Sequence, residues 1–381
     1  MHRKDYDFDG ANHKDLEIVK IKADQMRLKP DPKSKLRFGH TFSDHMLEIT
    51  WSNEKGWSRP LISPIHDLSL HPASKVFHYA VELFEGMKAY RNESNKIYLF
   101  RPEKNMERMY QSAIRSALPT FDTNELKKLI CELVKIDADW VPSPPNSLYI
   151  RPTLIATDPS LGIDYPTQAL LFVLTGPVGQ YYNTDFKPIS LYADSSYCRA
   201  FPGGVGQYKM GCNYAPTLLV SKIASSKNCQ QVLWLYGPEE WITEVGSMNI
   251  FVYWKNDEGE DELVTAPLCD GIILPGITRD SVLHMVKQMN RIKVSERYVS
   301  MAEIKRSIKE NRMYEMFGTG TACVVSPIGH ITYKNSITGN FEELIIPTII
   351  HKPNLMEKIY KTVVDIQYGT TEMPEWTVEI K

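Results

Sequence analysis

Several features are missing from this 381-residue sequence, and each gap excludes a class of protein. No apolar run approaches the roughly 20 residues needed to cross a bilayer, and the N-terminal stretch lacks the apolar core of a secretory signal. The six cysteines form no CxxC pair, and the histidines form no HxxxH or HxH pair beside acidic ligands. A net charge of −2 supplies no general basic field. We expect reduced thiols, no metal, no membrane and no nucleic-acid partner.

Two common enzyme motifs are also missing. GxSxG is absent, which argues against a serine hydrolase, and the glycine-rich GGVGQY does not match the dinucleotide fingerprint GxGxxG. The N-terminal stretch carries acidic residues, unlike a mitochondrial presequence. We therefore expect a cytoplasmic protein that acts on small molecules, with a mitochondrial location open only if a presequence precedes this sequence.

Composition and length predict a folded protein of two domains. The chain is 43% hydrophobic and 24% charged, as in ordinary globular proteins, and it exceeds the size at which one core stops growing. Turn residues and tyrosines at 179–188 lie between two strand patterns, which favours an interdomain loop there. We predict a small N-terminal domain at 1–178, with an arm at 1–40, and a large domain at 189–381.

Strand and helix patterns intermix along the chain, which predicts an α+β or mixed α/β fold. Strands are expected at 47–52, 96–100, 147–158, 169–179, 189–194, 231–237, 249–254, 262–267 and 271–276. Helices are expected at 76–90, 105–117, 123–141, 216–226, 278–289, 301–312 and 355–369, with Thr123 or Asn124 capping the third.

Three stretches could carry chemistry. Lys209 stands among glycines in AFPGGVGQYKMGCNYAPT, where a lysine with a lowered pKa could attack an aldehyde, although a solvated loop lysine is the commoner outcome. Glu244 lies in an apolar strand pattern, so it could pair with a pyridinium nitrogen or with a core arginine. The helix beginning near Thr278 and the turn GTGTA at 318–322, with Thr319 and Thr321, could bind phosphate, or could be a capped helix and a tight turn.

Taken in order, LFEGMKAY, NMERM, SLYIRPTLI, GVGQYKMGCNY, ITEVGSMN, ILPGITR and MFGTGTACVVSP resemble the branched-chain aminotransferases of pyridoxal-phosphate fold type IV, from about Phe38 to IQYG near the C-terminus. The resemblance implies a small α/β domain and a larger barrel-like domain with helices. It also implies transfer of the amino group of leucine, isoleucine or valine to 2-oxoglutarate. Cys212 departs from the pattern, because glycine is usual at its position.

The resemblance also implies roles for individual residues. The cofactor pyridoxal 5'-phosphate is expected to bind the catalytic Lys209 covalently and to contact Arg108, Tyr214, Glu244, Ile277, Thr278 and Thr321. The substrate is expected to meet Phe38, Tyr79, Phe84, Tyr149, Arg151, Tyr181, Ser247 and Ala322. Leu161 and Ile163 are expected to complete the partner's active site in a homodimer. The alternatives are a D-amino-acid transaminase or aminodeoxychorismate lyase of the same fold, or a catalytically silent regulatory protein.

Overall fold

The computed structural model describes residues 11–31, 34, 36–179, 187–352 and 354–381. The chain divides into two compact units. The first comprises Met1–Tyr181, Lys209–Cys212 and Asp365–Lys381, and the second comprises Tyr182–Tyr208 and Asn213–Val364. The loop expected at 179–188 falls mostly outside the described residues. The C-terminal segment, expected in the large domain, groups with the first unit because its last strand pairs with a strand of that unit's sheet.

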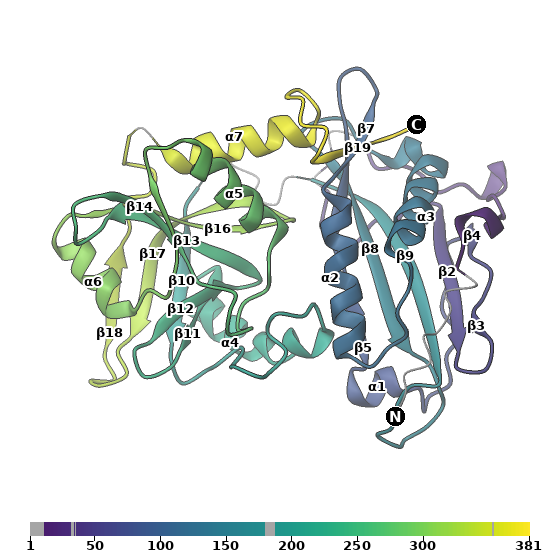
Figure 1. Cartoon of the computed structure of the whole chain (residues 1–381), viewed down its shortest axis with the longest axis horizontal. Helices are drawn as coiled ribbons and strands as arrows, with labels where there is room; N and C mark the ends of the chain where they lie inside the picture. Colours follow the sequence, from purple (N-terminus) through teal and green to yellow (C-terminus); the bar gives the residue numbers. More distant parts are fainter. Residues whose placement is uncertain (1–10, 32–33, 35, 180–186, 353) are drawn as a thin grey trace. The chain divides into compact units, whose positions relative to one another are not determined.

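A ten-stranded sheet forms the frame of the first unit (Figure 1). Its order is β1-β4-β2-β9-β8-β6-β7-β19, with β3 paired to β2 and β5 paired to β8. The strands are β1 (Glu17–Ile18), β2 (His45–Ser52), β3 (Gly56–Trp57), β4 (Leu61–Pro64), β5 (Glu82–Phe84), β6 (Met87–Arg91), β7 (Ile97–Phe100), β8 (Ser147–Ala156), β9 (Gln168–Val178) and β19 (Thr377–Ile380). Part of the expected N-terminal arm therefore belongs to this sheet, because β1 pairs with β4.

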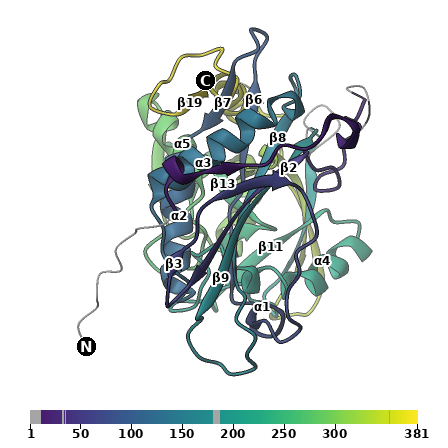
Figure 2. The ribbon, with the colours of Figure 1, turned by 90° about the vertical axis from the view of Figure 1, so that its right-hand side faces the viewer.

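Helices cover one face of this sheet, as the two views in Figures 1 and 2 show. They are α2 (Pro102–Arg115) and α3 (Thr123–Ile136). The unit also contains the short helix α1 (Lys75–Tyr79) and the 3-10 turns η1 (His13–Asp15), η2 (Ala23–Gln25) and η3 (Ala138–Trp140). Leu148 and Ile150 of β8 are fully buried in one cluster with Met109 and Leu129 of the helices. Because side chains alternate along a strand, Tyr149 between them lies on the opposite face.

Two local expectations in this unit are wrong. The predicted helix at 76–90 ends at Tyr79, where Ala80 takes a left-handed φ of 48°, and the following residues form β5 and β6 against β8. Strand pairing with a distant segment here outweighs the helical spacing of apolar residues. The cap of α3 is Asp122, whose carboxylate accepts hydrogen bonds from the N–H groups of Asn124 and Glu125 at 2.8 and 2.9 Å.

A nine-stranded sheet forms the second unit and closes on itself. Its order is β12-β11-β10-β17-β16-β13-β14-β15, and β12 also pairs with β13, which closes a six-stranded barrel. The strands are β10 (Ile189–Asp194), β11 (Gln231–Tyr236), β12 (Trp241–Val245), β13 (Met248–Lys255), β14 (Asp261–Thr265), β15 (Lys293–Glu296), β16 (Met313–Gly320), β17 (Val324–Lys334) and β18 (Phe341–Ile345), the last paired with β17.

Helices α4 (Thr217–Ser226), α5 (Ile277–Gln288), α6 (Met301–Lys309) and most of α7 (Leu355–Gln367) belong to the second unit, and the 3-10 turn η4 covers Gly211–Asn213. The strand predicted at 271–276 is wrong, because these residues form no ladder and lead into α5. The turn predicted at 318–322 begins later than expected, since Gly318–Gly320 still pair with β17.

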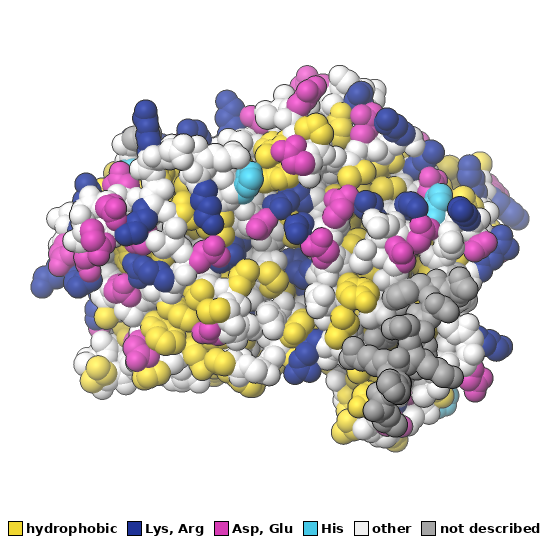
Figure 3. Space-filling model, viewed as in Figure 1, with side chains coloured by type: hydrophobic (Ala, Val, Ile, Leu, Met, Phe, Trp, Pro, Cys, Tyr) yellow, Lys and Arg dark blue, Asp and Glu magenta, His cyan; other side chains and the backbone are white. Residues whose placement is uncertain are grey.

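Charge on the visible surface is mixed. On the face drawn in Figure 3, side chains of both signs are interspersed and apolar side chains lie among them. This agrees with the net charge of −2. Among the described residues, no helix is long and apolar enough to cross a membrane.

Candidate active site

The backbone of Lys209 is fixed on both sides within the first unit. Its N–H donates to the hydroxyl of Ser112 on α2 at 3.0 Å, and its carbonyl accepts from the N–H of Phe84 at 3.0 Å. The next residue, Met210, forms a bridge with Leu83 of β5. The Lys209 amine lies 4.8 Å from the centroid of the Phe84 ring. The segment carrying the lysine is thus an added edge of β5, which sets where the amine can reach.

Arg108, expected to bind phosphate, is held by a fully buried carboxylate. Glu85 Oε1 accepts from Arg108 Nε at 2.7 Å, and Oε2 accepts from Arg108 Nη2 at 2.8 Å. Oε2 also accepts from Asn105 Nδ2 at 2.7 Å and from the N–H of Gly86 at 3.1 Å. Burial disfavours the charged form of Glu85, but the charge and hydrogen bonds of Arg108, with the charge of Lys209, hold its pKa below the usual value.

Four of the residues expected to bind substrate form one group on the open face of the same sheet. The ring centroids of Phe38 and Tyr149 are 4.8 Å apart, and the guanidinium of Arg151 lies 4.6 Å from the Phe84 ring centroid. Arg151 also donates to the hydroxyl of Tyr149 at 3.0 Å. Its Nε is buried and, among the described residues, has no hydrogen-bond partner. A buried donor of this kind is costly unless it binds an acceptor, so it suits a carboxylate ligand.

The loop between β8 and β9 presents apolar side chains to solvent. Leu161 is 63% exposed and Ile163 is 86% exposed. The Tyr79 hydroxyl donates a hydrogen bond to the carbonyl of Leu161. Lys75, buried at 1% exposure, pairs with Asp158 at 2.6 Å at the base of the loop. The loop is therefore anchored while its apolar tip stays uncovered.

In the second unit, Glu244 is buried and surrounded by donors. Arg199 Nε lies 3.0 Å from its Oε2, and its Oε1 accepts from the N–H of Leu274 at 2.9 Å and from Asn249 Nδ2 at 3.2 Å. Both sequence-based readings, an arginine partner and a ligand, therefore stay open. The arginine, the amide and the backbone N–H hold the carboxylate in the barrel wall, where it could pair with a cationic ring nitrogen.

The N-terminus of α5 lacks a side-chain cap, because a glycine stands at the cap position. Its cap is Gly276, which makes no side-chain hydrogen bond to the first turn, and Ile277 and Thr278 supply the first N–H groups. A Cβ at Gly276 would lie 1.9 Å from Asn249 Oδ1, so only glycine lets the helix start there without displacing Asn249. A helix N-terminus without a side-chain cap fits a phosphate group.

Other predicted residues lie at neighbouring strand ends of the barrel. Glu244 pairs in register with Asn249, which pairs with Thr319 on β16. Ser247 lies in the turn between β12 and β13, and Thr321 and Ala322 follow β16. The Thr319 hydroxyl is buried and has no hydrogen-bond partner among the described residues. The second unit thus gathers polar groups that fit a phosphate and a carboxylate.

Tyr214 follows the lysine segment and is half-buried. The loop before Lys209 is tied down by the neighbouring Asn213, whose Nδ2 donates to the carbonyls of Val205 and Tyr208 at 2.9 and 2.8 Å. Cys212 does not have a positive φ, so its position does not require the usual glycine. Tyr181 lies outside the described residues.

The structure adds positioning residues that the sequence did not reveal. They are Glu85, Ser112 and Asn249, each hydrogen-bonded to a predicted residue, and Arg199, which forms an ion pair with Glu244. Glu85 could have been singled out by the same signal as Glu244, a carboxylate within an apolar stretch. Ser112 and Arg199 carry no such signal, because their partners lie far away in the sequence.

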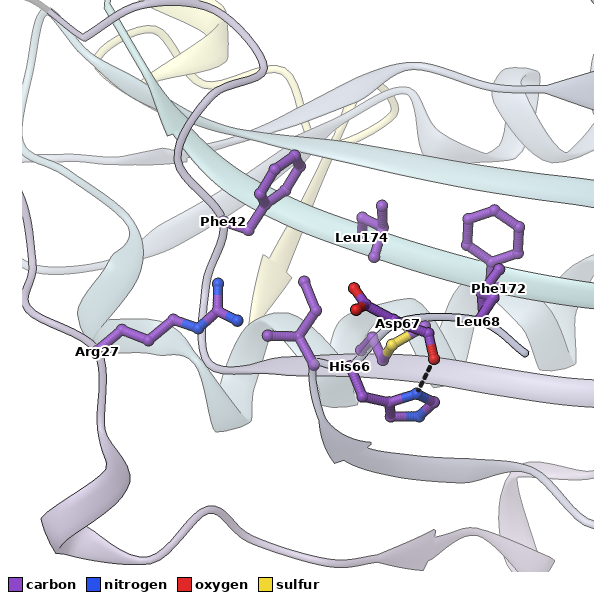
Figure 4. Close-up of a pocket in the computed structure, with 9 residues that line it drawn as sticks. Arg27, Phe42, His66, Asp67, Leu68, Phe172 and Leu174 are labelled. Atoms are coloured by element: carbon purple, nitrogen blue, oxygen red, sulfur yellow. Dashed lines mark hydrogen bonds between the residues drawn. The ribbon is translucent and has the colours of Figure 1, made fainter.

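A separate hollow of about 330 Å³ lies on the open face of the first unit's sheet (Figure 4). Phe42, Phe172 and Leu174 give it apolar walls, and Arg27 and His66 lie at its edge. A hydrogen bond with the Asp67 carbonyl raises the pKa of His66, with help from Glu48. None of its lining residues is a predicted site residue, so the hollow is not where the expected chemistry lies.

The chain matches the family model for amino-transferase class IV over residues 82–331. The chain belongs to the class IV aminotransferases. It is 56% identical over 369 residues to the cytosolic branched-chain-amino-acid aminotransferase of Caenorhabditis elegans, covering 97% of this chain and 89% of that one. It is 52% identical over 366 residues to the cytosolic enzyme of the same name from Ovis aries, covering 96% of this chain and 93% of that one.

Structural comparison supports the fold. The branched-chain amino acid aminotransferase of Thermobaculum terrenum, solved in its PLP form, aligns with a TM-score of 0.67 and 22% identity. The alignment covers 87% of this class IV chain and 98% of that chain. The predictions of a mixed α/β fold of type IV and of membership in this family are confirmed.

Proposed function

We propose that this class IV enzyme is a pyridoxal-phosphate-dependent transaminase that moves the amino group of leucine, isoleucine or valine to 2-oxoglutarate, reversibly. The observation that carries the proposal is the 56% identity over 97% of the chain to a branched-chain-amino-acid aminotransferase. The structure adds a lysine fixed by its backbone and a buried carboxylate held by Arg199. Both cytosolic names cited above support action in the cytosol.

The cofactor fits groups that the structure leaves in need of a ligand. The α5 N-terminus has no side-chain cap, and the Thr319 hydroxyl is buried without a partner among the described residues. Ile277 and Thr278 would donate backbone N–H groups to its phosphate, with Arg108 and Thr321 adding side-chain donors. Tyr214 would donate to the ring oxygen.

Bound pyridoxal phosphate supplies an electron sink that stabilises negative charge at the substrate's α-carbon. Glu244 would keep the proton on the ring nitrogen, since its carboxylate is buried and held in place by Arg199 and Asn249. Lys209 would bind the cofactor, release it to the substrate and then move the proton at the α-carbon. The backbone bonds of Lys209 to Ser112 and Phe84 would hold the base of the side chain still during these steps.

The substrate pocket would have an apolar lining and one cationic group. Phe38, Tyr79, Phe84 and Tyr149 would surround a branched aliphatic side chain, and Ser247 and Ala322 would lie near the α-carboxylate. Arg151, with its buried Nε, would donate hydrogen bonds to the distal carboxylate of glutamate in the second half-reaction, together with tyrosine hydroxyls, chiefly that of Tyr79. Two unlike substrates are thus served by one pocket, one through apolar contact and one through a salt bridge.

A substrate panel tests the proposal. We expect the holoenzyme, a yellow protein, to lose its colour on addition of L-leucine, and to regain it with 2-oxoglutarate. Turnover should be measured with L-leucine, L-isoleucine, L-valine, D-alanine and aminodeoxychorismate. Turnover of D-alanine or aminodeoxychorismate without turnover of leucine would replace the proposal with another fold type IV activity, and a colourless, inactive protein would indicate a silent regulatory one.

We further propose a homodimer in which Leu161 and Ile163 of each subunit line the partner's site. Their exposure of 63% and 86% is high for apolar side chains on a loop anchored by Lys75. Exposed apolar groups on a fixed loop are typical of surfaces that another molecule covers.

Subunit complementation tests the dimer. Lys209→Ala should be inactive because it lacks the amine. The double variant Leu161→Asp, Ile163→Asp should be inactive because it places carboxylates in the partner's apolar pocket. Refolded together in equal amounts, they should recover about a quarter of wild-type activity, since half the dimers then hold one complete site. No recovery, with dimers confirmed by light scattering, would refute the sharing of the site.

A further inference from the structure

Glu85 lies behind Arg108 in the first unit and is 0% exposed. Its two oxygens accept four hydrogen bonds, of which two come from Arg108 through Nε and Nη2. A two-point grip of this kind fixes both the plane and the direction of a guanidinium, because the fork of donors matches the carboxylate.

One face of helix α2 carries the partners of Glu85. Asn105, Arg108 and Ser112 stand at positions i, i+3 and i+7 of α2 and therefore share one face of that helix. Asn105 and Arg108 bind Glu85, and Ser112 binds the backbone of Lys209. One helix face thus aligns the arginine and the catalytic lysine within the same unit.

We propose that Glu85 is a positioning residue for the cofactor's phosphate, acting by holding the Nη1 edge of Arg108 in one direction. The inference rests on the proposed function, in which Arg108 binds that phosphate. Without the carboxylate, the buried guanidinium would lose two of its hydrogen bonds and could adopt other rotamers. The carboxylate therefore makes the arginine ready to bind before the cofactor arrives.

The sharpest variant is Glu85→Gln, which keeps the size of the side chain. Every donor around Glu85 points at an oxygen, so an amide NH₂ in either place would face donors from Arg108 and lose the two-point grip. The matched control is Glu262→Gln in the second unit. Glu262 is also buried, at 2% exposure, and accepts from Arg297 Nη2 at 3.1 Å and from Trp254 Nε1 at 2.8 Å.

The experiment compares two ligands, pyridoxal 5'-phosphate and pyridoxal, by titration of the apoenzyme. We expect Glu85→Gln to raise the Kd for pyridoxal 5'-phosphate on the order of 10- to 100-fold, the size of effect seen when a residue that orients a metal ligand is lost. The Kd for pyridoxal should change much less. Glu262→Gln should leave the ratio of the two constants at its wild-type value.

The other outcomes are decisive in different ways. If Glu85→Gln weakens both ligands equally, Glu85 is only a structural anion and the inference is overturned. If Glu85→Gln does not fold, Glu85→Asp decides, because its shorter side chain keeps the charge but cannot grip both edges of Arg108. A wild-type ratio in Glu85→Asp then overturns the inference. If the wild-type protein itself binds neither ligand, the proposed function fails, whatever Glu85 does.

Discussion

Replacing Lys209 by alanine should abolish transamination of leucine while leaving the cofactor bound. The amine is the only group here assigned to move the α-proton, and losing a general acid–base group costs about 10²–10⁴-fold in turnover. The phosphate and ring contacts proposed for Arg108, Thr278 and Glu244 do not involve this amine. Turnover with leucine and 2-oxoglutarate, together with the absorbance of the dialysed protein, measures both effects.

Borohydride reduction gives this variant a second readout. It should trap the cofactor on the wild-type protein and on Lys222→Ala, an exposed lysine of α4 that serves as the control. It should trap none on Lys209→Ala. Covalent trapping on Lys209→Ala would show that another lysine binds the cofactor.

Glu244→Gln should retain the fold and lose most of the activity. The glutamine keeps the shape of the side chain but removes the negative charge that would hold a proton on the ring nitrogen, and it leaves Arg199 without its ion pair. Loss of one preorganised electrostatic group costs on the order of 10²–10³-fold in kcat, and we expect a fall of that size. Single-turnover decay of the cofactor absorbance with leucine measures it directly.

The control is Glu240→Gln in the same unit. Glu240 is also buried, at 8% exposure, but its partner is the hydroxyl of Tyr333, which has no assigned role in the reaction. Its loss should lower stability and spare the single-turnover rate. Equal rate losses in both variants would show that Glu244 matters only for the stability of the barrel.

The sequence predicted well where a pattern is local. Helices α2, α4, α5, α6 and α7 and the long strands β8 and β9 were all expected, because their apolar residues repeat at a helical or strand period within a single segment. Prediction failed at residues 82–91, which form β5 and β6. Their helical spacing was real, but the partner that makes them strands is β8, more than fifty residues away.

In the candidate site, too, the sequence identified residues and the structure showed their contacts. Residue types and local patterns singled out Lys209 and Glu244 as candidates. The resemblance to the branched-chain aminotransferases added Arg108 and the substrate residues. No spacing showed that Ser112, 97 positions from Lys209, accepts its N–H, or that Glu85 grips Arg108. These contacts arise from strand and helix packing that brings distant segments together.

The sequence by itself determined which chemical groups are present, the class of fold and the family to which the chain belongs. Only the tertiary structure decided how those groups are held: Lys209 through its backbone, Arg108 by a buried carboxylate, and Glu244 by an arginine and an amide. The physical reason is that a side chain's charge and shape belong to its own residue. The desolvation and hydrogen bonding that fix its direction belong to neighbours that only folding supplies.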